Sequence, residues 1–288
     1  MHSRLAAAGY IAESSLATTL GLLELLKRPL LLEGDAGVGK TALAKALAEC
    51  EDRQLIRLQC YEGLDVDTAV YEWNYPRQLL SVKLQENSDS SLADKEAEIF
   101  SERYLLPRPL LRAISQDESP VLLIDEIDRA DEAFEAYLLE LLSDFQVSIP
   151  EFGTVPAKSI PRVVLTSNGT RELSDALRRR CLYYYLDYPD AGKECAIVRA
   201  HLPQIEEQLV RQLVAFVQGL RGLDMRKKPG VAETLDWAAA LWGTGKHGLP
   251  SAARMLRETL ACLVKTREDQ QQIDDGQLDK LLDAARGA

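Results

Sequence analysis

The chain has 288 residues and a formal net charge of −11, with 46% hydrophobic and 27% charged residues. These are the proportions of an ordinary globular protein. No apolar run of this chain reaches the roughly 18 residues of a membrane span, and its N-terminus does not resemble a secretion signal. From these two observations we expect a cytoplasmic protein. Because an acidic surface repels nucleic acid backbones, we expect its macromolecular partner to be a protein rather than a nucleic acid.

The first predicted elements surround a glycine-rich motif. Residues 3–26 form an Ala- and Leu-rich helical segment, and the apolar run 29–32 predicts a strand. Residues 34–41 then read Gly-Asp-Ala-Gly-Val-Gly-Lys-Thr, and a helix-forming segment follows. That order of strand, loop and helix is the context that a phosphate-binding loop requires. A glycine-rich turn before a core helix is the alternative, and the Lys-Thr pair argues against it.

The chemistry of this motif predicts a nucleoside triphosphate site. Glycines let the backbone curl so that successive N–H groups point at phosphate oxygens, and the following helix aims its positive dipole end at the same place. Lys40 is expected to reach the β and γ phosphates, while the Thr41 hydroxyl takes a magnesium position. The predicted cofactors are therefore ATP and Mg²⁺, and the predicted binding residues of the loop are Gly34, Asp35, Ala36, Gly37, Val38, Gly39, Lys40 and Thr41.

The segment after the first helix is less regular. Residues 54–60 alternate apolar and polar side chains, which suits a strand near the edge of a sheet. Residues 61–80 combine acids with four large aromatic side chains and follow neither the helical nor the strand period. Residues 86–95 are polar and predict a loop, and short helices are expected near 95–100 and 109–114.

Two acids follow the next apolar run, at residues 121–124. Such a run suits a strand buried on both faces of a parallel sheet, and α/β sheets place ligands at the carboxyl ends of their strands. We expect Asp125 to hold the magnesium through its water shell and Glu126 to polarise the attacking water. Two acids after a strand are also typical of a solvated loop, and only their combination with the phosphate-binding loop favours catalysis.

The following elements complete an α/β domain. The pattern predicts a helix over 131–143, a hairpin over 145–157, a strand over 162–168 that ends in Asn168, a helix over 172–180 and a strand over 182–186. Because strands and helices alternate, the predicted fold class is α/β with a mostly parallel sheet.

After residue 188 the chain shows helical periodicity only. The predicted helices cover 191–200, 204–221, 230–242, 250–266 and 276–285. We therefore predict an α/β nucleotide-binding domain over 1–188 and a helical lid domain over 189–288. The five cysteines lack a C-x-x-C pair and the three histidines are far apart, so we expect reduced thiols and no metal site built by the protein alone.

Four features occur in the order found in AAA+ ATPases, namely the phosphate-binding loop, the Asp125-Glu126 pair, the strand-terminal Asn168 and the arginine cluster 178–180. The chain resembles that class over nearly its whole length. The motif Ile-Asp-Glu-Ile-Asp-Arg-Ala at 124–130 and the predicted hairpin are similar to sequences of the MoxR family. Three further motifs resemble the CoxD-type branch of that family, and they lie at 57–65, 71–73 and 75–80.

This resemblance implies roles for further residues. Asn168 is the sensor that orients the lytic water, since an amide can both donate to phosphate and accept from water. Arg180 is the arginine finger that enters a neighbouring subunit's site, although the choice within 178–180 stays open and a solvated helix end is the alternative. Tyr10 and Ile11 match the place where the family holds adenine, with core packing as the alternative.

One position departs from the MoxR pattern. Where many such chains place a second sensor arginine at the start of a lid helix, this chain reads Pro-Gly-Val-Ala-Glu-Thr-Leu-Asp-Trp at 229–237, with no arginine. Arg254 and Arg257, on a later predicted helix, are candidates to replace it, and exposed helix charges are the alternative.

The resemblance implies an ATP-hydrolysing chaperone that matures or activates a metalloenzyme, such as a molybdenum hydroxylase of the carbon monoxide dehydrogenase type. It also implies a homo-oligomeric ring, most often a hexamer, with a client metalloenzyme and a von Willebrand A-type partner. The segments 61–80 and 145–157 are candidate client surfaces, with packing between subunits as the alternative. A nucleic-acid-directed AAA+ motor and an ATP-gated scaffold that does not hydrolyse ATP are the rival functions.

Overall fold

The computed structural model describes residues 1–84, 91–243, 249 and 256–287. The chain forms two compact units, and both are assembled from separated segments. The first contains Met1, Ser14–Glu33 and Leu47–Tyr184, and the second contains His2–Glu13, Gly34–Ala46 and Tyr185–Ala288. The phosphate-binding loop therefore belongs to the same unit as the C-terminal helices. The domain boundary between residues 188 and 189 stays a prediction.

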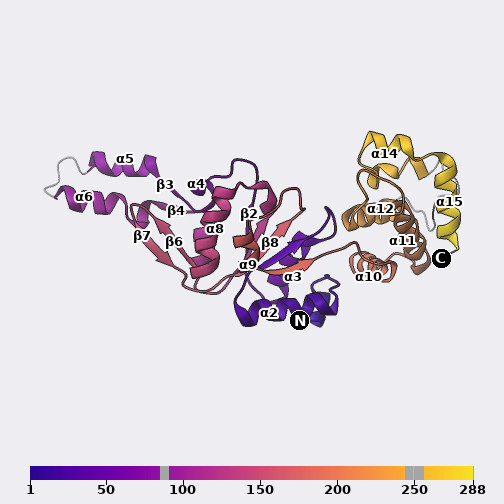
Figure 1. Cartoon of the computed structure of the whole chain (residues 1–288), viewed down its shortest axis with the longest axis horizontal. Helices are drawn as coiled ribbons and strands as arrows, with labels where there is room; N and C mark the ends of the chain where they lie inside the picture. The colour runs from indigo at the N-terminus through magenta and orange to yellow at the C-terminus, as the bar shows by residue number, and fades with distance from the viewer. Residues whose placement is uncertain (85–90, 244–248, 250–255, 288) are drawn as a thin grey trace. The chain divides into compact units, whose positions relative to one another are not determined.

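A five-stranded sheet with the order β2-β5-β8-β1-β9 organises the first unit (Figure 1). Parallel pairing joins β2 to β5, β5 to β8 and β8 to β1, so the predicted α/β fold with a parallel sheet is confirmed. The strands are β1 Leu30–Glu33, β2 Leu55–Gln59, β5 Val121–Asp125, β8 Arg162–Ser167 and β9 Leu182–Tyr185.

The burial pattern of each strand agrees with its place in the sheet. Every residue of β5 is buried, and β8 is buried except at its first residue, whereas β2 alternates between buried and partly exposed side chains. Continuous apolar runs suit central strands covered on both faces, and alternation suits an edge. Helices α7 (Pro109–Ile114), α8 (Glu132–Asp144) and α9 (Asp175–Arg180) share one apolar core with β2, β5 and β8. Helix α2 (Ser14–Leu26) buries a separate leucine stripe.

An insertion between β2 and β5 carries two helices that run side by side (Figure 1). Its base is an antiparallel pair of short strands, and the Gln78 side-chain amide donates to the Ile99 carbonyl at 2.8 Å, which ties the two helices together. The elements are α4 Val66–Ala69, β3 Tyr71–Trp73, α5 Tyr75–Leu84, α6 Leu92–Ile99, the 3-10 helix η1 Glu102–Tyr104 and β4 Leu105–Pro107.

This insertion is where the sequence predicted least. Residues 61–80 are divided among α4, β3 and the start of α5, and the first two are too short to show any period. The predicted loop 86–95 lies partly outside the described residues, and it is wrong where α6 begins at Leu92. By contrast, the predicted hairpin is confirmed as β6 (Gln146–Ile149) and β7 (Gly153–Pro156), where Gly153 takes a positive φ of 101° after the turn.

The second unit packs its helices around an apolar core of its own. Helices α10 (Ala191–His201), α11 (Glu207–Arg221), α12 (Val231–Gly243) and α15 (Asp275–Arg286) confirm four of the predicted lid helices. The fifth, over 250–266, falls partly outside the described residues, and its later part contains the 3-10 helix η3 (Leu260–Cys262). The remaining elements are α1 His2–Ala7, α14 Arg267–Gln272 and α3 Lys40–Cys50, which begins in this unit and ends in the first.

A buried ion pair organises the helices of the second unit. Glu194 of α10 is 0% exposed, and its two carboxylate oxygens each accept a 2.7 Å hydrogen bond from the guanidinium of Arg221 on α11. Thr234 of α12 and Gln218 donate to the same carboxylate at 2.7 and 2.8 Å. The Arg221 guanidinium also lies 4.9 Å from the ring centroid of Tyr188. Among the described helices, none is long and apolar enough to cross a bilayer.

Candidate active site

The phosphate-binding loop starts at the residue after β1 and ends in the first turn of α3. Gly37 and Gly39 have φ values of 82° and 100°, a backbone conformation in which a Cβ atom is strained. The Lys40 side chain folds back over the loop, where its Nζ donates to the carbonyls of Gly34 at 2.6 Å and Asp35 at 2.7 Å. The ammonium group of this largely buried lysine is thus held at the loop that the sequence assigns to phosphate.

The start of the lid helix α12 rests directly on this loop. The Val231 N–H donates to the Gly37 carbonyl at 2.8 Å. A Cβ atom added to Gly230 would lie 2.6 Å from the Gly37 Cα, which leaves no room for a side chain. The absence of an arginine at 229–233, noted from the sequence, therefore has a steric reason at Gly230. Of its two candidate replacements, Arg254 lies outside the described residues, and Arg257 donates to the Asp275 carboxylate and the Ile273 carbonyl.

The predicted adenine-contacting residues belong to the same unit as the loop. Tyr10 and Ile11 are both partly buried and follow α1. A Cβ atom added to Gly39 would lie 3.9 Å from Cε2 of the Tyr10 ring, so this ring is a neighbour of the loop backbone. An aromatic face at that point can stack against a base.

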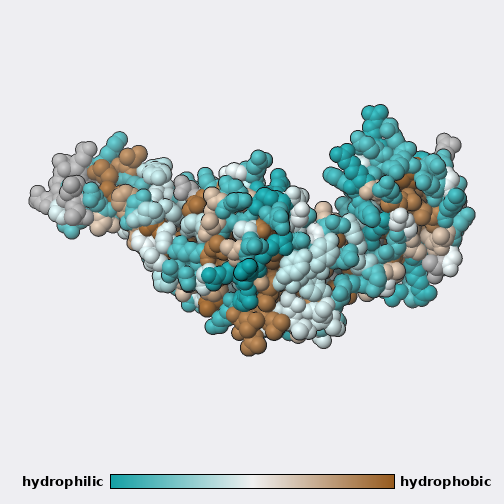
Figure 2. Space-filling model, in the orientation of Figure 1, coloured by the Kyte–Doolittle hydropathy of each residue, from teal (hydrophilic) through white to brown (hydrophobic). Residues whose placement is uncertain are grey.

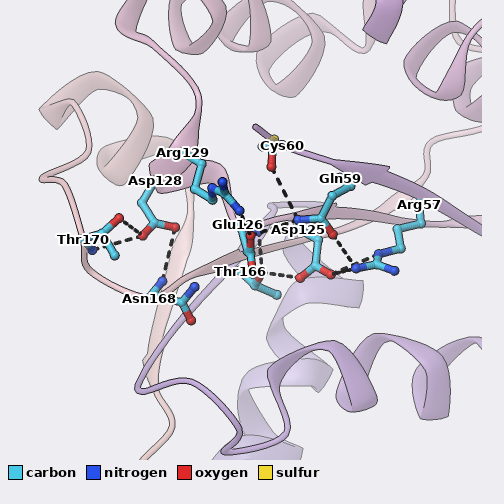
Figure 3. Close-up of polar contacts among 10 residues, drawn as sticks. All are labelled: Arg57, Gln59, Cys60, Asp125, Glu126, Asp128, Arg129, Thr166, Asn168 and Thr170. Carbon is cyan, nitrogen blue, oxygen red and sulfur yellow. Dashed lines mark hydrogen bonds and ion pairs between the residues drawn. The ribbon is translucent and has the colours of Figure 1, made fainter. Parts of the chain in front are cut away.

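In the first unit, the buried Asp125 ends β5 with both carboxylate oxygens occupied (Figure 3). Oδ1 accepts from the Thr166 hydroxyl at 2.6 Å. Oδ2 accepts from Arg57 twice, from Nε at 3.0 Å and from a terminal guanidinium nitrogen at 2.6 Å. The carboxylate is therefore held rigidly between β8 and the edge strand β2.

Glu126 takes the left-handed backbone conformation, with a φ of 56°. A non-glycine residue in this region carries strain, which persists only where its surroundings enforce it. Here the Glu126 N–H donates to Thr166 Oγ1 at 2.9 Å, and Oε2 accepts from Gln59 at 3.1 Å and Arg129 at 3.2 Å. The chain turn thereby presents a partly exposed carboxylate beside the buried one.

Asn168 follows β8 and is anchored through its backbone. Its N–H donates to Asp128 Oδ1 at 3.2 Å, and Asp128 Oδ2 accepts from the Thr170 amide and hydroxyl at 3.0 and 2.6 Å. Burial raises the pKa of Asp128, but the hydrogen bonds from Thr170 and Asn168 outweigh it, so the pKa lies below its ordinary value. The ionised Asp128 thus fixes the turn that carries Asn168.

The three arginines at the end of α9 differ in their surroundings. Arg178 is partly buried and pairs with Glu33 at 3.3 Å, whereas Arg179 and Arg180 are exposed. Arg28 holds the end of α9 by donating to the backbone carbonyls of both exposed arginines. The assignment of Arg180 as a finger stays a prediction.

Sequence reasoning missed the side chains that hold the two acids. Arg57 and Gln59 alternate with buried residues on β2, which was the available signal, because alternation puts both side chains on one face and the parallel register pairs Gln59 with Asp125. Thr166, on the neighbouring strand β8, is the third side chain that contacts the acids. Nearby, burial raises the pKa of the Cys60 thiol to about 12, with the charges of Asp125, Asp128 and Glu126 adding to it, so the thiol stays protonated.

The two predicted metal-binding side chains lie in different units, Thr41 in the second and Asp125 in the first, and each carries an oxygen that a divalent metal can take. The Thr41 hydroxyl and the Asp125 carboxylate are hard oxygen donors of the kind that Mg²⁺ takes, and Mg²⁺ keeps several waters in such sites. Within the part of the chain that the structure describes, no group of three or more His, Cys, Asp or Glu side chains could hold a metal ion.

A parallel sheet whose strand β1 leads into a phosphate-binding loop, and whose strand β5 ends at Asp125 just before Glu126, is typical of the P-loop class of nucleotide-binding folds. A family model described as the AAA domain of the dynein-related subfamily matches residues 29–181. The chain belongs to this family, whose members bind nucleotide with a divalent metal.

Two relatives and one solved structure show the degree of similarity. The chain is 28% identical over 203 residues to the gas vesicle ATPase GvpN of Haloferax mediterranei, and the match covers 67% of this chain and 56% of that protein. The chain thus spans little more than half the length of this relative. It is 27% identical over 216 residues to an uncharacterized protein of Staphylococcus aureus, which covers 72% of this chain and 73% of that one. A crystal structure of a Cytophaga hutchinsonii protein superposes with a TM-score of 0.49 and 16% identity, covering 98% and 92% of the two chains.

Proposed function

We propose that this chain is a cytoplasmic Mg²⁺-dependent ATPase of the MoxR type that works as a chaperone for a metalloenzyme. The observation that carries the ATPase part is the strained turn at Glu126, which presents a carboxylate beside the buried Asp125 at the end of β5. Strain of this kind is concentrated at active sites and ligand-binding sites. Membership of the AAA family supports the same conclusion.

In this proposal the chain's own groups divide the work. Lys40 exchanges its two backbone carbonyl partners for phosphate oxygens, and the loop N–H groups bind the same anion. Glu126 accepts a proton from the attacking water, while the Asn168 amide orients that water. Bound Mg²⁺, held by Thr41 and Asp125, would neutralise phosphate charge.

Glu126→Gln tests the hydrolytic role. The amide keeps the shape of the side chain but cannot accept the proton, so we expect turnover to fall by about 100-fold or more while ATP still binds. Phosphate release and the binding of a fluorescent ATP analogue are the two measurements. Glu132→Gln, an exposed acid at the start of α8, is the matched control and should hydrolyse normally. Unchanged turnover in Glu126→Gln would remove this residue from the mechanism.

A ring, most often a hexamer in this class, would let an exposed arginine of α9 act on a neighbour's nucleotide. Mixing Arg180→Ala subunits with Glu126→Gln subunits tests this directly, because each supplies what the other lacks. We expect the mixture to regain part of the wild-type turnover that neither variant shows alone. The same mixture made with Arg178→Ala or Arg179→Ala identifies the finger. Failure of all three mixtures would rule out catalysis in trans.

The metalloenzyme client is proposed from the sequence motifs that resemble the CoxD-type branch. The exposed apolar surface of the insertion between β2 and β5 supports a protein partner. Tyr75, Leu79, Leu80 and Leu84 of α5 are 58% to 77% exposed, and Figure 2 shows apolar side chains gathered over this helix. Leu79→Ser with Leu80→Ser should abolish activation of a co-expressed molybdenum hydroxylase but leave ATP turnover intact. A von Willebrand A-type partner would be sought in the same co-expression. Normal activation by the double variant would exclude α5 as the client surface.

One observation favours a second candidate, an ATP-gated scaffold that hydrolyses ATP too slowly to use the energy. No arginine stands in the segment that starts the lid helix α12, and Gly230 leaves no space for a longer side chain against the loop. Turnover of the wild-type protein with and without a partner separates the two functions. Nucleotide-dependent assembly without measurable phosphate release would support the scaffold.

A further inference from the structure

Arg57 contacts the metal-binding carboxylate, yet the proposed reaction assigns it no role. Its Nε and one terminal nitrogen both donate to Oδ2 of Asp125, at 3.0 and 2.6 Å. The other oxygen, Oδ1, already accepts from the Thr166 hydroxyl at 2.6 Å. The side that β8 does not cover is therefore occupied by a cation from the chain itself (Figure 3).

We propose that Arg57 is a positioning residue that acts as an internal counter-ion for Asp125 and has to withdraw from Oδ2 before the divalent metal of the nucleotide can bind there. The inference rests on the proposed ATPase function and adds to it a control on metal loading. An oxygen that accepts two guanidinium N–H groups has no lone pair left for a metal or for the water shell of one. The positive charge of the guanidinium also opposes the approach of a divalent cation.

The position of Arg57 allows this withdrawal. Its side chain is 48% exposed, while that of Asp125 is only 4% exposed, so the arginine can move into solvent but the carboxylate stays in place. The backbone under it is fixed, because β2 pairs in register with β5 and the Cys60 N–H donates to the Asp125 carbonyl at 2.8 Å. A side chain rotation at the sheet edge is enough to free Oδ2.

The same movement reaches the second acid. Arg57 also donates to Oε1 of Gln59, and the Gln59 amide donates to Oε2 of Glu126 at 3.1 Å. Asp125, Arg57, Gln59 and Glu126 therefore form one hydrogen-bonded chain across β2 and the end of β5. Withdrawal of the Arg57 guanidinium would break its bond to Gln59, while Gln59 and Arg129 can still donate to Glu126. Metal loading and the hydrogen bonds around the proposed general base are then linked through one exposed side chain.

A purely structural role for Arg57 makes the opposite prediction. If the guanidinium only oriented Asp125 for metal, its removal would weaken metal binding. If it competes with metal, its removal strengthens binding by the cost of breaking the pair. A partly exposed ion pair is worth up to about 1 kcal/mol, which corresponds to about fivefold in affinity. The sign of the change therefore decides between the two roles.

The test is a Mn²⁺ titration followed by electron paramagnetic resonance, with each protein bound to a non-hydrolysable ATP analogue. In Arg57→Met, which keeps most of the apolar stem, we expect half-saturation at about fivefold lower Mn²⁺ than in the wild type. Arg57→Lys retains the charge without the paired N–H groups and should fall between the two. Arg103→Ala, which removes an exposed cation of η1 paired with Glu98 at 3.6 Å, is the control and should match the wild type.

The proposal is overturned if the Mn²⁺ concentration at half-saturation is equal or higher in Arg57→Met than in the wild type. If Arg57→Met does not fold, a half-saturating Mn²⁺ concentration for Arg57→Lys at or above the wild-type value overturns it in the same way. Binding of the analogue in the presence of EDTA reports folding independently of the metal. A wild-type protein that binds no Mn²⁺ with the nucleotide would refute the proposed ATPase function itself. A wild type that binds metal normally, with unchanged variants, refutes only the role of Arg57.

Discussion

The Thr166 hydroxyl connects both acids of the candidate site, so its removal is the most informative single change in the first unit. It donates to Asp125 Oδ1 at 2.6 Å and accepts from the Glu126 N–H at 2.9 Å, and Thr166 is 1% exposed. Thr166→Val keeps the volume of the side chain but leaves a carboxylate oxygen and an amide without this partner. Because the site is buried, solvent cannot replace the lost contacts.

The expected magnitude follows from these two bonds. A hydrogen bond to a charged group contributes about 1.5–3 kcal/mol and a neutral one about 0.5–1.5 kcal/mol, so the sum is roughly 2–4.5 kcal/mol. A unit of this size loses about 2–4 °C of Tm per kcal/mol, which predicts that the melting transition of the first unit falls by about 4–18 °C. Turnover should fall by about 10- to 100-fold, because Glu126 loses the contact that fixes its backbone.

Thr166→Ser is the matched control, since it keeps the hydroxyl and removes only a methyl group. Scanning calorimetry and phosphate release should place the serine variant close to the wild type and well above the valine variant. If Thr166→Val melts and hydrolyses ATP like Thr166→Ser, then the hydroxyl does not organise the two acids and the reasoning fails.

Two further predictions concern buried charges. Glu194→Gln leaves the Arg221 guanidinium, which is 6% exposed, without its buried counter-charge. Calorimetry should show the second unit destabilised by about 3–5 kcal/mol. The control Glu207→Gln, at an exposed ion pair, should destabilise the unit far less. Similar losses in both variants would contradict this account. For Asp128, the lowered pKa means that its contribution to stability is present above its ordinary pKa of 3.8 and is lost as the pH falls below that value. The urea midpoint of Asp128→Asn should therefore approach that of the wild type below pH 3.8, and a constant difference down to about pH 2 would show that the carboxylate charge contributes nothing.

Local chain order was enough to predict the central elements. The segment 121–124 is continuously apolar and 162–168 contains the apolar residues 163–165, a pattern that favours strands buried on both faces. The phosphate-binding loop was recognisable because its glycines, Lys40 and Thr41 are consecutive, so no long-range contact is needed to bring them together. The hairpin at 145–157 was predicted for the same reason, since its two strands are joined by a short turn.

Tertiary structure decided what depends on neighbouring strands and on space. The pairing of β2 with β5 sets Arg57 and Gln59 beside Asp125 and Glu126, although 66 residues or more separate the members of each pair in the chain. The short elements of the insertion have no period of their own and take shape through pairing between β3 and β4. The contact of Gly230 with Gly37 is steric and invisible to local pattern. The sequence by itself thus determined the parallel-sheet class and the loop chemistry, because both follow from consecutive residues. Only the folded chain decided which side chains hold the two acids, because strand register is a long-range property.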